Sequence, residues 1–199
     1  YMKKLPLKYE NPFDNMIYVF VEEISPHLYK AKLTPNMVTT FGNILSIIGL
    51  INLYYRKYFE ASIYFGVSYV LDCVDGYMAR KYKMVSKFGD YYDHISDISK
   101  WILFAISLYL LKPKTFIKIL PLMLLFLYLL NVQMSTQEYY YNNTESSPSL
   151  EYLKRIIPSC IQPKNKKQSK KIMRMTRYFG SGTFTFVMVL IIMFYDKLN

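Results

Sequence analysis

The chain has 199 residues, of which 52% are hydrophobic, and its 25 Lys and Arg residues outnumber 14 Asp and Glu residues to give a formal net charge of +11. A nucleic-acid-binding protein can carry such a charge, but the apolar residues here gather in three uncharged stretches of 18 to 23 residues, each long enough to cross a bilayer as a helix. This composition excludes a disordered chain and a water-soluble globule, and two cysteines are too few for a disulfide framework. We therefore expect an all-α integral membrane protein whose partner is the lipid bilayer, with no nucleic-acid partner.

The first predicted element is an amphipathic helix near the N-terminus. Between Asn11 and Leu28, apolar residues recur at helical spacing beside three acidic residues. This pattern is typical of a helix that lies in the membrane interface, and an ordinary packing helix would fit it as well. We assign residues 1–33 to this juxtamembrane segment and residues 34–199 to a transmembrane domain.

Five membrane-spanning helices are predicted in the transmembrane domain, at residues 34–55, 60–80, 92–111, 117–137 and 178–196. Two of them contain aspartates, which are costly inside a membrane and normally face the interior of a bundle. The residues alone therefore predict a helical bundle of five transmembrane helices with an N-terminal interfacial amphipathic helix.

Basic residues are divided unequally between the two predicted sides of the membrane. The side of the N-terminus holds 19 of them and the opposite side holds 6. The positive-inside rule therefore places the N-terminus and the aspartate-rich stretch in the cytoplasm. The same side holds a polar loop at about residues 138–177, whose basic run from Lys164 to Arg177 is interpreted as an anchor facing anionic lipid. The prediction is a multi-pass membrane protein with its functional site facing the cytoplasm.

The candidate functional residues are acidic. Five of the 14 acidic residues fall within the 26 positions from Asp72 to Asp97. Asp72 and Asp75 share a helix face through i, i+3 spacing, and Asp93 and Asp97 share one through i, i+4 spacing. A short basic turn at residues 81–87 would make the two helices antiparallel neighbours. We therefore expect the four carboxylates to meet at the cytoplasmic mouth of the bundle.

Four negative charges so close together in a low dielectric require counterions. Two divalent cations would balance them, and all-oxygen ligation favours Mg²⁺ or Mn²⁺ over zinc. The small residues Gly76 and Ala79 leave room for a ligand on the same helix, and the guanidinium group of Arg80 suits a phosphate. The residues alone thus predict a two-metal site for a phosphorylated substrate beside lipid.

The acidic residues belong to a longer pattern, Asp72-x2-Asp75-Gly76-x2-Ala79-Arg80-x8-Gly89-x3-Asp93-x3-Asp97. This pattern resembles the signature of the CDP-alcohol phosphotransferases, also called CDP-alcohol phosphatidyltransferases. The segment from Leu33 to Thr39 is similar to the family's Thr-Pro-Asn-x-x-Thr element. The resemblance covers residues 30–135 well and is weaker beyond them.

Six spans are usual in the family that the chain resembles, so the resemblance implies a helical bundle of five to six transmembrane helices. A sixth span is either missing from the end of the sequence, replaced by a short or re-entrant element at residues 150–161, or supplied by a partner protomer.

The resemblance also implies an enzyme of phospholipid biosynthesis, with a homodimer as its default assembly. Such an enzyme moves a phosphoryl-alcohol or phosphatidyl group from a CDP-linked donor to an acceptor hydroxyl and releases CMP. By the resemblance, Asp72 and Asp93 bridge the two cations, Asp75 completes the first metal site, and Asp97 contacts the second cation and acts as the general base. The residues implied to contact the CDP moiety are Thr34, Pro35, Asn36, Met37, Gly76, Ala79, Arg80 and Ser86.

The family signature is shared by two substrate arrangements. Asp93-His94 followed by Asp97 resembles the choline/ethanolamine phosphotransferases, which use CDP-choline or CDP-ethanolamine and diacylglycerol. The small size of the chain and the pair Arg174 and Arg177, expected to bind a phosphorylated acceptor, resemble the phosphatidyltransferases, which use CDP-diacylglycerol and a small polar alcohol. We favour the phosphatidyl arrangement. A nonenzymatic membrane scaffold is the alternative from another functional class.

Overall fold

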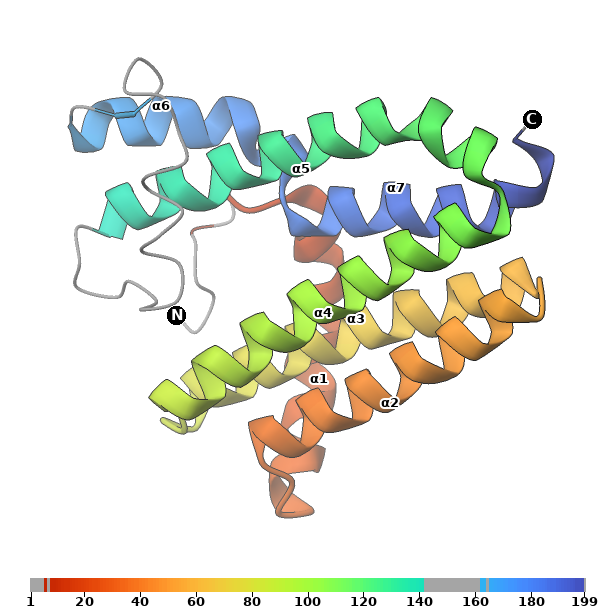
Figure 1. The fold of residues 1–199 in the computed structure, drawn as a ribbon. Coiled ribbons are helices and arrows are strands. Elements are labelled where there is room, and N and C mark those ends of the chain that lie inside the picture. Colours follow the sequence, from red (N-terminus) through yellow and green to blue (C-terminus); the bar gives the residue numbers. More distant parts are fainter. Residues whose placement is uncertain (1–5, 7, 142–161, 164, 199) are drawn as a thin grey trace.

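Short turns join the first five helices of the protein (Figure 1). The structure, a computed structural model, describes residues 6, 8–141, 162–163 and 165–198. Its helices are α1 (Pro12–Lys30), α2 (Pro35–Tyr54), α3 (Tyr58–Lys81), α4 (Lys87–Leu111), α5 (Pro113–Tyr141), α6 (Lys166–Thr176) and α7 (Ser181–Phe194), with 3-10 turns at Arg177–Phe179 and Tyr195–Lys197. The described residues contain no β-strand. The all-α prediction is therefore confirmed.

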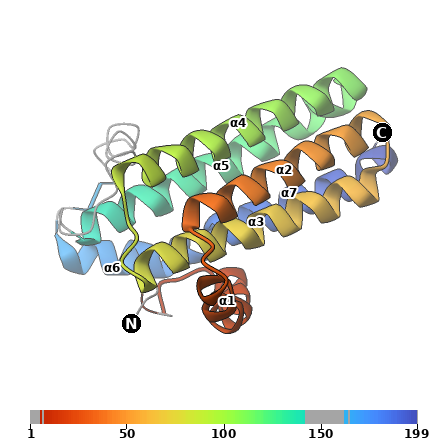
Figure 2. The same ribbon diagram turned by 90° about the horizontal axis from the view of Figure 1, so that it is seen from below.

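The long helices form a bundle suited to a bilayer. By length and hydropathy, α2, α4, α5 and the stretch from Lys166 to Lys197, which joins α6 to α7, can each cross a membrane. α3 runs alongside them (Figures 1 and 2) but is not in this apolar set, since it carries Asp72 and Asp75. The outer faces of α2 and α4 expose residues such as Ile47 and Ile102. These faces suit lipid, and the predicted spans correspond to α2, α3, α4, α5 and α7.

The polar loop predicted at residues 138–177 is helical at both ends. α5 continues to Tyr141, and α6 occupies most of the basic run. Asn165 begins α6 by accepting a hydrogen bond from the backbone N of Gln168 at 2.9 Å, and Ser169 and Met173 are buried where α6 packs on α5. Lys, Gln and Met all have high helix propensity, which outweighs the charge repulsion along this run. The middle of the predicted loop, including the re-entrant element suggested at residues 150–161, lies outside the described residues.

α2 and α3 pack closely because small residues line their contact. A Cβ atom built on Gly49 would lie 3.0 Å from Cδ2 of Phe65, and one built on Gly42 would lie 3.5 Å from the carbonyl oxygen of Ser68. Ser46 and Ser68 are hydrogen-bonded through their Oγ atoms at 2.7 Å. Small residues allow such close approach of membrane helices, and the approach brings the start of α2 beside the aspartates of α3.

α3 and α4 are antiparallel, as predicted, but they are not closely packed neighbours. α3 packs mainly on α2 and α7, whereas α4 packs mainly on α2 and α5. The turn at residues 82–86 reverses the chain at the end of the bundle where α2 begins (Figures 1 and 2). α2 thus supports both helices, and side chains rather than backbone contacts span the space between α3 and α4.

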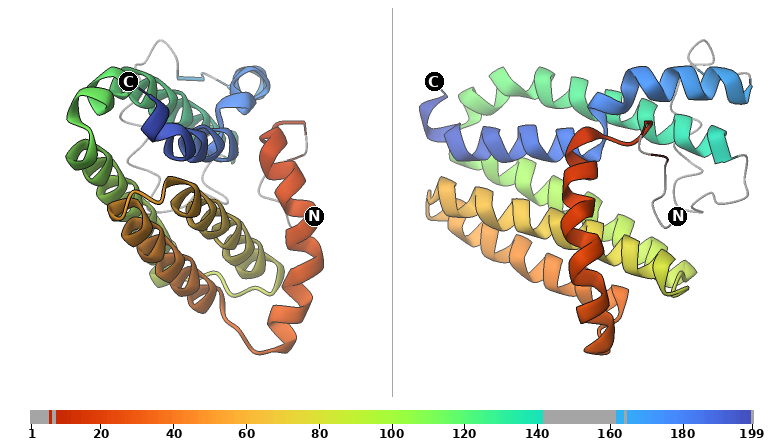
Figure 3. Two further views of the ribbon diagram at one scale, coloured as in Figure 1. Left: turned by 90° about the vertical axis from the view of Figure 1, so that its right-hand side faces the viewer. Right: turned by 180° about the vertical axis from the view of Figure 1, so that it is seen from behind.

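α1 runs across the direction of the other helices (Figure 3). Its inner face buries Tyr18 and Val21 in an apolar cluster with Tyr77 of α3, while Met16 and Phe20 on its outer face are exposed. A transverse amphipathic helix with one face packed on the bundle and the other exposed fits both predicted alternatives, an interfacial helix and a packing helix.

Asp14 ties α1 to the start of α7. Its carboxylate accepts hydrogen bonds from the hydroxyl of Tyr69 at 2.6 Å and from the backbone N of Gly182 at 3.4 Å. Gly180, at the N-cap position of α7, has no side chain to accept such a bond. Asp14 therefore provides a cap from a distant part of the chain. Its own burial raises its pKa above the ordinary value, although these hydrogen bonds act in the opposite direction.

Gly182→Ala is expected to destabilise the protein by about 3 kcal/mol, because overpacking a closed site forces neighbouring groups apart. A Cβ atom at residue 182 would overlap Oδ1 of Asp14 and lie 2.9 Å from its Cγ. Thermal unfolding of the purified protein in detergent measures the effect. Gly66→Ala is the matched control, since its Cβ atom would meet nothing closer than 4.0 Å. An equal loss of stability in both variants would contradict the close contact between α1 and α7.

Candidate active site

Three of the four predicted aspartates converge between α3 and α4. Asp72 and Asp75 come from α3 and Asp93 from α4, and one carboxylate oxygen from each lies within 4.8 Å of the others. Asp75 is 3% exposed, and the other two are partly buried. This spacing suits carboxylates that share a cation.

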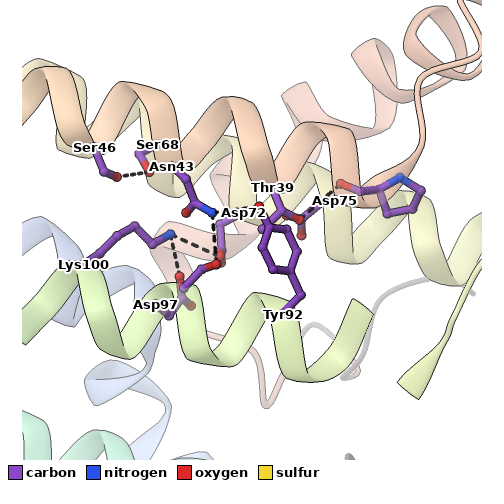
Figure 4. Close-up of polar contacts among 11 residues, drawn as sticks. Thr39, Asn43, Ser46, Ser68, Asp72, Asp75, Tyr92, Asp97 and Lys100 are labelled. Carbon is purple, nitrogen blue, oxygen red and sulfur yellow. Dashed lines mark hydrogen bonds and ion pairs between the residues drawn. The ribbon is translucent and has the colours of Figure 1, made fainter. Parts of the chain in front are cut away.

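Asp75 is held by the start of α2. Oγ1 of Thr39 lies 2.5 Å from Oδ2 of Asp75 and also 3.2 Å from the carbonyl oxygen of Pro35 (Figure 4). Thr34 caps the same helix by accepting a hydrogen bond from the backbone N of Met37 at 3.3 Å. The first turn of α2 therefore orients a carboxylate of α3. Thr39 stands in the Thr-Pro-Asn-x-x-Thr element, but local spacing alone gives no indication of its contact with Asp75.

Two carboxylate oxygens of the aspartate cluster have no hydrogen-bond donor among the described residues. Oδ1 of Asp72 and Oδ1 of Asp93 are buried and accept no hydrogen bond within the part of the chain that the structure describes. A buried carboxylate oxygen without a donor is costly unless a cation or another ligand compensates it. The residues present therefore fit a divalent metal site.

Asp97 lies beside this cluster and contacts a cation of the protein itself. Nζ of Lys100 is 2.6 Å from Oδ1 of Asp97 and 4.0 Å from Oδ1 of Asp72 (Figure 4). Lys100 is one of the 19 basic residues that the charge count places on the side of the N-terminus, but its side chain is 15% exposed and points to the carboxylates. The i, i+3 spacing of Asp97 and Lys100 in an apolar helix is the signal that could have located it.

Gly76 directly follows Asp75 on α3, and Arg80 lies about one turn further along the same helix. A Cβ atom on Gly76 would lie 3.2 Å from Nη1 of Arg80, so the absent side chain leaves room for the guanidinium group. Nη2 of Arg80 donates a hydrogen bond to the hydroxyl of Tyr18 at 3.4 Å. Ala79 lies beside them on the same helix and is partly buried.

Ser86 and Asn36 meet where α4 begins. Ser86 caps α4 by accepting a hydrogen bond from the backbone N of Gly89 at 3.0 Å. A Cβ atom on Gly89 would lie 3.0 Å from Oδ1 of Asn36, so this glycine lets α4 start against the first turn of α2. The structure thus places Ser86 with the predicted residues Thr34, Pro35, Asn36 and Met37, at the end of the bundle where the chain turns from α3 to α4.

A cavity of about 160 Å³ opens beside the carboxylates. Of the predicted residues, Asp72, Gly76, Arg80 and Asp93 line it. Tyr69 and Cys73 of α3 also line it. The remaining walls were not predicted, because they come from distant parts of the chain: Glu10, Asn11, Asp14 and Tyr18 at α1, Leu130, Gln133, Met134 and Gln137 on α5, and Gly180 and Ser181 at α7. On α5, two glutamines at i, i+4 spacing in an otherwise apolar helix were the sequence feature that could have predicted this wall of the cavity.

Arg174 and Arg177 do not line this cavity. Arg174 is exposed on α6. Arg177 donates from Nη1 to the carbonyl oxygen of Lys8 at 3.2 Å and from Nη2 to the hydroxyl of Tyr178 at 2.8 Å. The structure therefore does not bring this pair to the carboxylates.

A comparison with known protein families shows which family the chain belongs to. The sequence model of the CDP-alcohol phosphatidyltransferase family matches residues 32–196. The chain belongs to this family. A curated member, archaetidylinositol phosphate synthase of Pyrococcus horikoshii, is 35% identical over 92 residues, which cover 44% of this chain and 48% of that protein. The chain thus spans about half the length of the curated relative that it matches. No solved structure matches it.

The range matched by the CDP-alcohol phosphatidyltransferase family contains the carboxylate cluster but not all of the cavity around it. The matched range includes every residue of the Asp72–Asp97 pattern and the first turn of α2. α1, which forms one wall of the cavity, lies outside the matched range. The family relationship therefore covers the acidic site but does not extend to the α1 wall.

Proposed function

We propose that the chain is a membrane-embedded enzyme that moves a phosphatidyl group from a CDP-linked lipid to the hydroxyl of a small polar alcohol. The acceptor oxygen attacks the phosphorus that bears the lipid, the bond from this phosphorus to the bridging oxygen breaks, and CMP leaves with the bonding electron pair. The cluster of Asp72, Asp75 and Asp93 carries this proposal, since two of its buried oxygens lack hydrogen bonds and it adjoins a cavity lined by Arg80.

The carboxylates are proposed to hold two divalent cations, Mg²⁺ or Mn²⁺. Asp72 and Asp93 would bridge the two, Asp75 would complete the first site, and Asp97 would contact the second. When bound, such a pair neutralises a diphosphate and stabilises the negative charge on a departing oxygen. The buried Oδ1 atoms of Asp72 and Asp93, which accept no hydrogen bond from the described residues, support this assignment.

The remaining polar groups would orient the substrates. Asp97 is proposed to accept the proton of the acceptor hydroxyl, and Arg80 to donate hydrogen bonds to a phosphate of the donor. Gly76 and Ala79 would leave space for the donor beside α3. The first turns of α2 and α4 are proposed to close over the nucleotide through Thr34, Pro35, Asn36, Met37 and Ser86.

The acceptor is proposed to be a phosphorylated polyol. The name of the curated relative, archaetidylinositol phosphate synthase, supports this choice and the phosphatidyl arrangement. Arg174 and Arg177 would hold the acceptor's phosphate. Because neither side chain lines the cavity, this role requires the acceptor to extend beyond it.

The site is proposed to face the cytoplasm, and the protein to act as a homodimer. The excess of basic residues supports the orientation: without Lys100, which points to the carboxylates, 18 lie on the side of the N-terminus and 6 on the other. The turn from α3 to α4 and helix α6 lie toward one end of the bundle, and the C-terminus lies at the other (Figure 1). Residues 1–33 would form the juxtamembrane segment and residues 34–199 the catalytic domain.

An assay for CMP release from labelled donors tests the proposal. Purified protein in lipid nanodiscs with Mg²⁺ is expected to release CMP from CDP-diacylglycerol only when a polar alcohol is present, with inositol phosphate preferred to inositol, serine and glycerol phosphate. A parallel reaction offers CDP-choline and diacylglycerol. Release in that reaction alone would assign the protein to the choline/ethanolamine arrangement. No release from any donor would overturn the enzymatic proposal in favour of a scaffold.

A further inference from the structure

Lys100 brings a positive charge of the protein itself into the acidic site. It lies on α4, one turn beyond Asp97, and its ammonium group is 2.6 Å from Oδ1 of Asp97 and 4.0 Å from Oδ1 of Asp72 (Figure 4). The Lys100 side chain is only 15% exposed. The ammonium group therefore joins carboxylates of α3 and α4, two helices that make few direct backbone contacts.

A lysine at this position has an electrostatic cost that its surroundings must offset. α4 is one of the helices suited to crossing a bilayer, and charged side chains inside such helices normally serve a site. The ion pair with Asp97 offsets the cost of burying Lys100. It also engages one carboxylate oxygen of Asp97 and leaves the second oxygen for another partner.

We propose that Lys100 is a positioning residue for Asp97 and a resident cation that lowers the affinity of the carboxylate cluster for divalent ions. The inference rests on the proposed function, in which Asp97 takes the acceptor proton and the aspartates hold metal. Lys100 would fix Asp97 by holding Oδ1. It would at the same time repel cations a few ångströms away and so prevent them from binding too tightly.

These two effects predict that removing the charge of Lys100 raises the affinity for divalent ions and lowers kcat. Even at the dielectric constant of water, about 80, a unit charge about 5 Å from a divalent ion changes its affinity by about tenfold. Lys100→Met should therefore bind Mn²⁺ about tenfold more tightly or better. Its kcat should fall while the KM for the CDP-linked donor stays nearly constant, because Asp97 is no longer held in place. A lysine that only supported the fold would weaken metal binding and stability together.

The experiment titrates the purified protein with Mn²⁺ and measures free ion by electron paramagnetic resonance, which requires no activity. Lys100→Arg keeps the cation and should retain the wild-type affinity. Lys112→Met is the matched control: Lys112 pairs with Asp196 at 2.9 Å in the last 3-10 turn, away from the carboxylates, and its loss should leave Mn²⁺ binding unchanged. Unchanged or weaker binding by Lys100→Met would overturn the proposal.

A second comparison covers the case in which Lys100→Met alone does not fold. Asp97→Asn and the double variant Asp97→Asn/Lys100→Met differ only in the cation, and the double variant should bind Mn²⁺ about tenfold more tightly. Equal affinities would overturn the role of Lys100. A wild-type protein that released CMP from a CDP-linked lipid but bound no Mn²⁺ would overturn this inference without affecting the proposed reaction. Metal binding without CMP release would instead contradict the proposed reaction.

Discussion

Asp93→Asn is expected to lower kcat by about a thousandfold, which corresponds to about 4 kcal/mol of transition-state stabilisation. The amide has nearly the same size as the carboxylate but lacks the negative charge that a divalent cation requires. Oδ1 of Asp93 accepts no hydrogen bond from the described residues, so the substitution breaks no bond there. The loss should therefore be one of chemistry rather than of folding, and CMP release by the purified variant measures it.

The stability of this variant should not fall with its activity. Removing one of several carboxylates that lie within 4.8 Å of one another relieves repulsion between like charges. In chelator, the melting temperature of Asp93→Asn should therefore equal or exceed that of the wild type. Asp90→Asn is the control, because Asp90 lies on the same helix outside the cluster, and its turnover should change little. More than a tenth of wild-type turnover in Asp93→Asn would contradict the role assigned to Asp93.

The parts of the fold that sequence predicts well are those that depend on local periodicity. Uncharged stretches locate the spans, and the spacing of Asp72, Asp75 and Asp93 places their carboxylates on facing helices, where the structure brings them within reach of one cation. Hydropathy and helical spacing act over a few turns of one helix, so they can be read from neighbouring residues. The position of each helix against the others cannot be read in this way.

Contacts between distant residues explain what the sequence analysis missed. The cap that Asp14 places on α7 joins residues 168 apart, and the hydrogen bond from Thr39 to Asp75 joins residues 36 apart. Lys100 was assigned to the cytoplasm because the positive-inside rule counts charges near helix ends without asking which face they occupy. α6 was missed because its five Lys and Arg residues resemble a solvated loop, whereas the burial of Ser169 and Met173 depends on α5.

Arg80→Lys is expected to lower kcat/KM for the CDP-linked donor by about a hundredfold, or about 2.7 kcal/mol. The guanidinium group is placed before any ligand arrives, since Nη2 donates to the hydroxyl of Tyr18 at 3.4 Å and Nη1 would lie 3.2 Å from a Cβ atom at Gly76. A guanidinium group offers parallel N–H donors to two phosphate oxygens, whereas an ammonium group is a compact point charge that cannot offer that pair.

The control is Lys81→Met, which removes the neighbouring charge. Nζ of Lys81 lies 3.4 Å from Oγ of Ser25 and 5.2 Å from the ring centre of Tyr77, and the residue does not line the cavity. Its loss should therefore change kcat/KM for the donor by less than about threefold, if positive charge at this end of α3 acts only through general attraction. The KM for the acceptor should stay constant in both variants. Equal losses in Arg80→Lys and Lys81→Met would show that net charge, rather than a guanidinium group held over Gly76, attracts the donor's phosphates.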